Sequence, residues 1–275
     1  MAFDVNSFVF DHVVRGVGFN SDGSVRWMAN QIENGSLKCD GEEVLKKDAQ
    51  GSTIYSKSKA KTCEFSWESS VADLNLIAEM NGTTKEVASS SNTIESPLFD
   101  TIEITQDNQT EITLTNAVYN SGTTVAPVYK IGITSLTTDG SIKKTFKKGD
   151  AAATGVFTYT PASKKLTFAT GDLMKGDTLF ISYSYETENA VQVINSADDM
   201  PKATRSIYLI EGYDICDQNT VIYAYLVFPN AKMNVGYTLG LDIDSTVPVT
   251  QTCAYDYCSK NKELYRLIIP QSVEV

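Results

Sequence analysis

The sequence contains few of the residues from which catalytic and metal sites are built. Its 275 residues include one histidine, His12, two tryptophans and five cysteines. A lone imidazole excludes any site that needs two, such as a histidine-rich zinc site. The sequence also lacks a G-x-S-x-G element that would present a nucleophilic serine. We therefore expect no enzyme activity, no cofactor and no metal ion, and a binding or structural role for the chain.

The cysteines are too sparse for a disulfide scaffold. They are Cys39, Cys63, Cys216, Cys253 and Cys258, an odd number in a long chain. Four residues separate the last two, a wider spacing than in the usual zinc knuckle, and no second half of such a motif follows. We expect free thiols in a reducing cytosol.

Positive charge is also in short supply. Asp and Glu number 34 against 23 Lys and Arg, which gives a net charge of −11 at pH 7. Holding nucleic acid by phosphate neutralisation needs a basic face, which this composition does not favour. The single basic run lies beside a hairpin turn and is interpreted as an exposed turn; it consists of Lys143, Lys144, Lys147 and Lys148.

Long apolar runs are absent. The longest extends from Val221 to Phe228, far short of a membrane span. The first twelve residues carry acids where a secretory signal needs positive charge. We expect a protein that is made and folded in a cytosol and does not associate with a membrane.

What the sequence does contain is the alternation typical of strands. In 53–69, Cys63, Phe65 and Trp67 alternate with polar residues, which predicts a half-buried strand. Trp27 and Trp67 are expected in a core or an interface rather than in a sugar-binding platform. The segment 41–52 is charged and bounded by glycines, and it predicts an exposed hairpin loop. Further strands are expected at 101–105, 110–117, 156–160, 165–169, 178–185, 204–217, 220–233, 237–244, 249–259 and 263–270.

One segment has helical rather than strand periodicity. Residues 69–82 place Val71, Leu74, Ile77 and Ala78 on one stripe. Ser69 or Ser70 is the expected N-cap, Asp73 falls in the first turn, and Gly82 ends the helix. The sequence therefore predicts an all-β protein, mainly antiparallel, with one flanking helix.

A middle block has its own turn rhythm. Between 128 and 187 a turn signal recurs every eight to twelve residues, as in a small antiparallel sandwich. We predict an inserted domain at 101–189 within a discontinuous core formed by 1–100 and 190–275. One continuous large β-sandwich is the alternative.

A strand over Lys59–Trp67, followed by a short helix over Val71–Met80 that ends at Gly82, resembles the tail tube proteins (major tail proteins) of tailed bacteriophages. The strand-rich run 207–233, with a Phe-Pro-x-Ala-Lys turn at Phe228–Lys232, is similar to the closing strands of that family. The block that follows Gly155 resembles the immunoglobulin-like modules common in phage virion proteins.

The resemblance implies a β-sandwich or barrel core of the tail-tube type, with an immunoglobulin-like insertion on the outside of the tube. It implies a structural virion protein, six copies of which form a ring, with rings stacked into a conduit for DNA ejection. The charged segment 41–52 is then the expected stacking arm between rings, with Glu42, Glu43, Lys46 and Lys47 at the contact.

The partners implied by the resemblance are further copies of the chain and the tape measure, tail terminator and tail tip proteins. DNA would pass through without specific binding, and an acidic bore would let it slide. The implied location is the tail of the virion, after synthesis in the bacterial host cytoplasm.

Other functions remain open at this point. A capsid decoration or baseplate ring protein could share the same strand pattern, and a carbohydrate-binding adhesion module is a third possibility. An enzyme that uses an unrecognised carboxylate pair would depend on residues such as Glu186 or Asp242.

Overall fold

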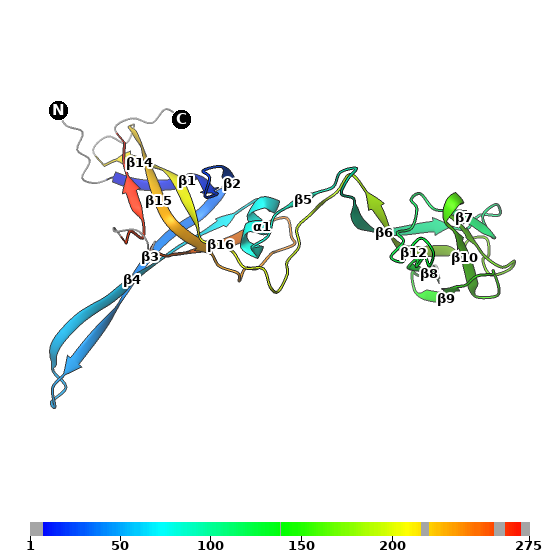
Figure 1. Cartoon of the computed structure of the whole chain (residues 1–275), viewed down its shortest axis with the longest axis horizontal. Coiled ribbons are helices and arrows are strands. Elements are labelled where there is room, and N and C mark those ends of the chain that lie inside the picture. Colours follow the sequence, from blue (N-terminus) through cyan, green and yellow to red (C-terminus); the bar gives the residue numbers. More distant parts are fainter. Residues whose placement is uncertain (1–7, 138, 216–219, 256–261, 271–275) are drawn as a thin grey trace. The chain divides into compact units, whose positions relative to one another are not determined.

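The computed structural model describes residues 8–137, 139–215, 220–255 and 262–270. The all-β class predicted from the sequence is confirmed, because the described residues form mostly antiparallel strands and one α-helix, α1 (Leu74–Asn81) (Figure 1). Among the helices described, none is long and apolar enough to cross a membrane.

The chain divides into two compact units. The first consists of Met1–Lys85 and Val193–Val275, and the second is Glu86–Gln192, inserted between them. We predicted that the first unit extends to residue 100 and that the insertion begins at residue 101. Instead, strand β6 (Ile94–Glu103) pairs along its whole length with β12 (Thr178–Thr187), so these residues belong to the insertion. Pro97 is tolerated there because β6 is an edge strand.

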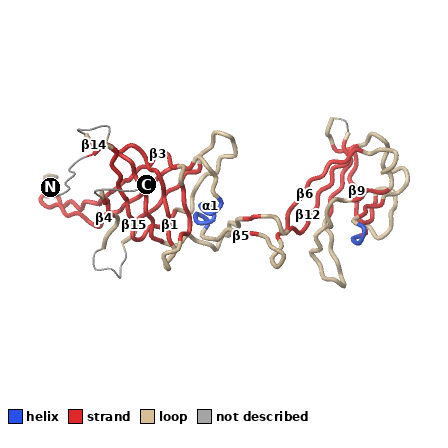
Figure 2. Tube along the Cα trace, turned by 90° about the horizontal axis from the view of Figure 1, so that it is seen from above, coloured by secondary structure: helices blue, strands red, loops and turns tan. Residues whose placement is uncertain are grey.

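The first unit is built on one curled, eight-stranded sheet (Figure 2). The strand order is β2-β1-β14-β15-β16-β4-β3, and β17 pairs with β15. The curl brings β1 close to β3 at Val13 and Gly35. The strands are β1 (Phe8–Phe19), β2 (Val25–Ala29), β3 (Ile32–Lys47), β4 (Thr53–Ser69), β14 (Thr204–Asp214), β15 (Val221–Met233), β16 (Val247–Cys253) and β17 (Arg266–Ile268).

Aromatic side chains fill the inside of this curl. Trp27 and Trp67 are buried there, as expected, beside Tyr208. Trp67 Nε1 donates to the Tyr208 hydroxyl at 3.1 Å, and that hydroxyl donates to Gln251 Oε1 at 2.7 Å. Burial raises the pKa of Tyr208 far above its ordinary value, so the phenol remains a donor.

Two glycines of β1 leave the space for these rings. A Cβ at Gly18 would lie 2.0 Å from Trp27 Nε1, and one at Gly16 would lie 2.6 Å from a ring carbon of Tyr208. Both distances are too short for any side chain. The rings therefore pack directly on the backbone of β1.

Helix α1 covers one end of this core. Its N-cap is Asp73, which accepts from the amides of Asn75 and Leu76, so the prediction of Ser69 or Ser70 was wrong. Ser69 instead ends β4, and its hydroxyl donates to the carbonyl of Val71. Gly82 ends the helix in the left-handed conformation, with φ of 74°.

The buried face of α1 also differs from the predicted stripe. Leu76, Ile77 and Met80 enter the core, whereas Val71 and Leu74 are exposed. Val71 precedes the N-cap Asp73 and Leu74 is the first helical residue, so the predicted stripe continues into the core only at Ile77 and Ala78.

Glu79, also on α1, is buried and forms an ion pair with Arg26 of β2. Desolvation raises the pKa of Glu79, and the guanidinium of Arg26 opposes part of that rise.

The second unit has its own sheet and core. Its strand order is β6-β12-β8-β9-β10-β11-β7, and the β9–β10 pairing is parallel. Phe157, Leu166 and Leu179 are fully buried at its centre. The further strands are β7 (Glu111–Thr113), β8 (Ile131–Leu136), β9 (Ile142–Lys148), β10 (Val156–Thr160) and β11 (Lys165–Thr167). The likeness to immunoglobulin modules stays a prediction.

The two ends of the insertion meet each other. Strand β5 (Glu86–Val87) pairs with β13 (Val191–Gln192), and the amide of Ala88 donates to the carbonyl of Ala190 at 2.9 Å. The insertion therefore begins and ends on a short two-stranded pair.

Candidate assembly surface

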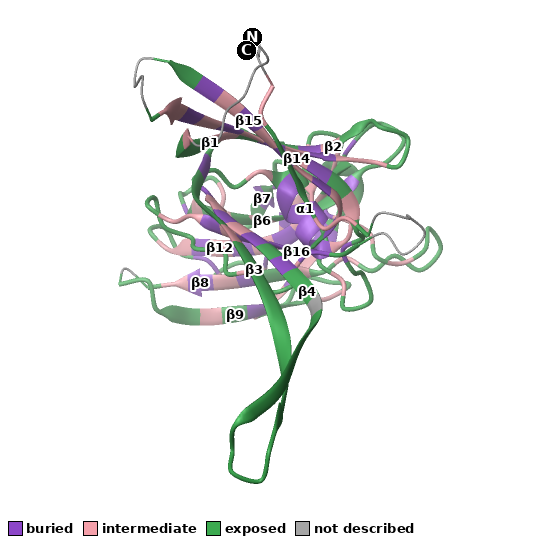
Figure 3. Cartoon of the chain, turned by 90° about the vertical axis from the view of Figure 1, so that its left-hand side faces the viewer, coloured by how far each residue is buried: buried purple, intermediate pink, exposed green. Residues whose placement is uncertain are grey.

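The first unit contains a two-stranded β-ribbon that extends beyond the rest of its sheet. Strand β16 pairs with β4 only from Ser69 to Cys63. Beyond Cys63, β4 has β3 as its single partner among the described strands. Figure 3 shows this ribbon, residues 40–62, extending as an exposed hairpin. We call it the arm.

The segment predicted as a loop is therefore mostly strand. Strand β3 continues to Lys47 and β4 begins at Thr53, so only Asp48–Ser52 turns. Asp48 Oδ1 accepts from the amides of Gln50 and Ser52 at 2.9 and 2.8 Å, and Gly51 has a φ of 87°. A turn of this chemistry joins the two strands of a hairpin. The charged sequence of this segment lacks alternation and therefore did not predict the strands.

The four predicted contact residues all lie on β3 in the arm, and all are exposed; they are Glu42, Glu43, Lys46 and Lys47. Glu42 forms an ion pair with Lys59 across the ribbon, at 2.7 Å between Oε1 and Nζ. Glu43 faces Ser58, and Lys46 faces Tyr55. The structure thus brings them onto one strand, with one register irregularity between Gly41 and Glu43 and another between Lys46 and Lys47.

Sequence reasoning missed the apolar residues of the same arm. Val44, Leu45, Ile54 and Tyr55 are all exposed, and Ile54 is 59% accessible. The detectable signal was the apolar content at 44–45 and 54–55 within a charged segment. Two strands alone in water are marginally stable, so a long ribbon with apolar side chains is suited to lie against a partner.

A second apolar segment is exposed between β15 and β16. We predicted a strand at 237–244, and the structure has none there. Leu241 is 88% accessible and Ile243 is 100% accessible. Apolar and polar residues alternate in this segment as they do in a strand, but none of the described strands pairs with it.

The third feature is the sheet face opposite the core. Met28, Val17, Ile207 and Val227 face one another in register across β2, β1, β14 and β15. They alternate with buried neighbours, so they lie on the outer face, and they are exposed or half-buried. This row forms an apolar stripe across four strands.

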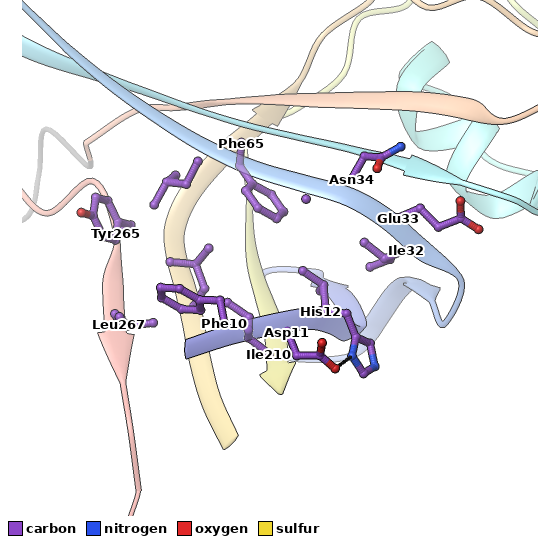
Figure 4. Close-up of a pocket in the computed structure, with 14 residues that line it drawn as sticks. Phe10, Asp11, His12, Ile32, Glu33, Asn34, Phe65, Ile210, Tyr265 and Leu267 are labelled. Carbon is purple, nitrogen blue, oxygen red and sulfur yellow. Dashed lines mark hydrogen bonds and ion pairs between the residues drawn. The ribbon is translucent and has the colours of Figure 1, made fainter. Parts of the chain in front are cut away.

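A cleft of about 830 Å³ opens between β1 and β3 (Figure 4). Its walls are mainly apolar, with Ile32, Phe65 and Ile210 among them. Asp11 and His12 line the cleft as well, with Asp11 Oδ2 2.9 Å from His12 Nδ1.

Those two residues belong to the one group in the described part of the chain that could hold a metal ion. A register shift in β1 sets Asp11 beside His12, which faces Glu211 of β14. One ligand atom from each lies within 4.8 Å of the others. The group is at the surface, where such acidic clusters are common without a metal ion.

The remaining predicted features lie elsewhere. In the basic run, Lys143 pairs with Asp177 and Lys144 with Asp172, each at 2.6 Å, so these lysines serve the second unit internally. Cys216 and Cys258 lie outside the described residues, and with them the Cys253–Cys258 spacing.

No protein-family model matches the sequence, and no curated protein matches it.

Proposed function

We propose that this chain is the major subunit of a bacteriophage tail tube, a structural protein without catalytic activity. Six copies form a ring, and stacked rings form the conduit for DNA ejection. Its partners are other copies of the chain and, at the ends of the tube, the tape measure, terminator and tip proteins. Its place is the tail of the virion.

The arm is the observation that carries this proposal. From Asp40 to Lys47 it spans about 25 Å at the usual rise of a strand. Every described side chain between Lys38 and Thr62 is exposed. An extended ribbon of this length gains stability when a neighbouring subunit covers it, as in contacts between stacked rings.

Two further features favour repeated self-association. The apolar stripe across β2, β1, β14 and β15 is a sheet face that a second copy could cover. The segment around Leu241 and Ile243 has the alternation of a strand and pairs with no described strand of its own chain. Joining such elements around a ring removes exposed edges. The net charge of −11 suits a bore through which DNA slides.

The test is assembly with and without the arm's apolar residues. Negative-stain electron microscopy and sedimentation velocity across salt and protein concentration should show six-fold rings or hollow filaments of uniform width. The double variant Leu45→Ser with Tyr55→Ser should lose the filaments while keeping its unfolding transition. The matched control, Val125→Ser with Ile142→Ser, removes two apolar residues of the second unit that are more exposed than Leu45 and Tyr55, and it should assemble normally.

Other outcomes argue against the proposal. A small closed oligomer that never elongates would favour a decoration or baseplate ring protein. Normal filaments from the arm variant would show that the arm does not make the contact. A melting temperature that rises with added sugars would favour an adhesion module.

A further inference from the structure

Three of the five cysteines lie side by side across three neighbouring strands. Cys39 of β3 faces Cys63 of β4, and Cys63 faces Cys253 of β16. The Sγ atoms of Cys39 and Cys63 are 3.4 Å apart. Cys63 and Cys253 are buried, whereas Cys39 is exposed.

This arrangement fits a disulfide between the first two. Residues directly opposite in an antiparallel pair have Cα atoms about 4.5 or 5.5 Å apart, and both spacings lie within the range that disulfides span. The two sulfur atoms already touch, so small side-chain rotations close the remaining distance. Packing alone explains a buried thiol, but it does not explain an exposed thiol held against a buried one.

We propose that Cys39 and Cys63 form a redox-reactive pair, which a two-electron oxidant of the peroxide class converts into a disulfide at the base of the arm. The pair lies where the ribbon leaves the three-stranded part of the sheet, since β16 reaches Cys63 and no further along β4. The disulfide closes a loop that contains the whole arm.

The chemistry balances with hydrogen peroxide as the oxidant. Cys39 gives its proton to solvent, and its thiolate attacks one peroxide oxygen; the O–O bond breaks, Cys39 becomes a sulfenic acid, and the departing hydroxide takes up a proton to give the first water. The sulfur of Cys63 then attacks the Cys39 sulfur, its proton goes to the departing hydroxyl, and the second water leaves. Two thiols have lost two electrons and the peroxide has gained them.

The environment sets the order of these steps. Burial raises the pKa of Cys63, and it raises the pKa of Cys253 to about 11, so both remain thiols near neutral pH. Cys39 is the member of the trio that an oxidant meets first. Cys253, next to Cys63 in register, is the competing partner.

The experiment treats the full-length chain, fully reduced and then desalted, with hydrogen peroxide. We expect an intramolecular disulfide between the peptides that contain Cys39 and Cys63, identified by mass spectrometry and reversed by dithiothreitol. Its formation should raise the melting temperature by several degrees, because a loop is closed in the unfolded chain. Cys253→Ser should still form this disulfide, and Cys39→Ser should not.

Each other result overturns the assignment. A Cys63–Cys253 disulfide would show that the exposed thiol is not the reactive one. Oxidation of Cys39 to sulfinic acid, or disulfides only between chains, would show that Cys63 does not reach it. An unchanged set of thiols under excess peroxide would remove the pair altogether. Cys39→Ser changes an exposed residue, so this variant should fold normally. Circular dichroism checks that its failure to form the disulfide is not caused by misfolding.

Discussion

The two units stabilise their strands in different ways. In the second unit every strand of the sheet has its partners within the unit, and Lys143, Lys144 and Lys165 pair with its own carboxylates. In the first unit, two strands leave the sheet as the arm, and apolar residues face outward. The second unit therefore keeps its strands within the sheet, whereas the first extends a two-stranded, exposed ribbon beyond its sheet.

The largest effects should come from the two cores. They are separate clusters, so we expect two unfolding transitions in calorimetry. Trp67→Ala should destabilise the first unit by about 3–5 kcal/mol, and Phe157→Ala should destabilise the second by a similar amount. Each variant should shift one transition and leave the other in place. A single transition that both variants shift would mean that the units unfold together.

A smaller effect should appear as pH dependence within the first unit. The folded-state pKa of Glu79 is raised by burial. Its contribution to stability is therefore fully present below the ordinary carboxyl pKa and is lost as pH rises through the raised value. Glu79→Gln should remove this loss, so its stability relative to the native chain should improve from about pH 4 to pH 7.

Chemical denaturation of both proteins across that pH range measures the difference. Glu43→Gln is the control, because that side chain is exposed on the arm. A stability difference between Glu79→Gln and the native chain that does not change with pH would contradict the burial argument.

The smallest effect on stability should come from the arm's ion pair. Glu42 and Lys59 are both more than half exposed, so Glu42→Lys should change the free energy of unfolding by less than about 0.5 kcal/mol. The exchanged pair, Glu42→Lys with Lys59→Glu, keeps the intrachain attraction. If the arm's charges meet another subunit, the exchanged variant should melt normally and assemble poorly at low salt, as seen by sedimentation velocity. Normal assembly would place these charges away from any contact.

The sequence predicted best those strands with one face in a core. In β14, Ser206, Tyr208 and Ile210 are buried and alternate with half-buried residues, and this alternation is visible in the sequence. The expected helix was found for a similar reason, although its N-cap was misplaced because serine and aspartate compete for that position.

The strands of the arm could not be predicted from such alternation. When both faces of a strand meet solvent, nothing selects apolar residues at every second position, so 41–47 looks like a charged loop. The prediction for 237–244 was wrong for the opposite reason. The segment has the alternation of a strand, but it pairs with none of the described strands.

The cysteine trio needed structural information of another kind. Cys39, Cys63 and Cys253 become neighbours only through the register of three strands, one of which is distant in sequence. Spacing within the sequence suggested only the pair Cys253 and Cys258, and no periodicity could have revealed the trio.

The glycines of β1 have a consequence for how this protein can evolve. Gly18 lies against the ring of Trp27, and Gly16 lies against the ring of Tyr208. A substitution at either glycine is therefore expected to require a substitution at the aromatic residue that it contacts. Among homologues, a larger residue at position 18 should occur only with a smaller one at position 27. These pairings are the co-variation that an alignment of relatives should show first, ahead of any residue on the surface.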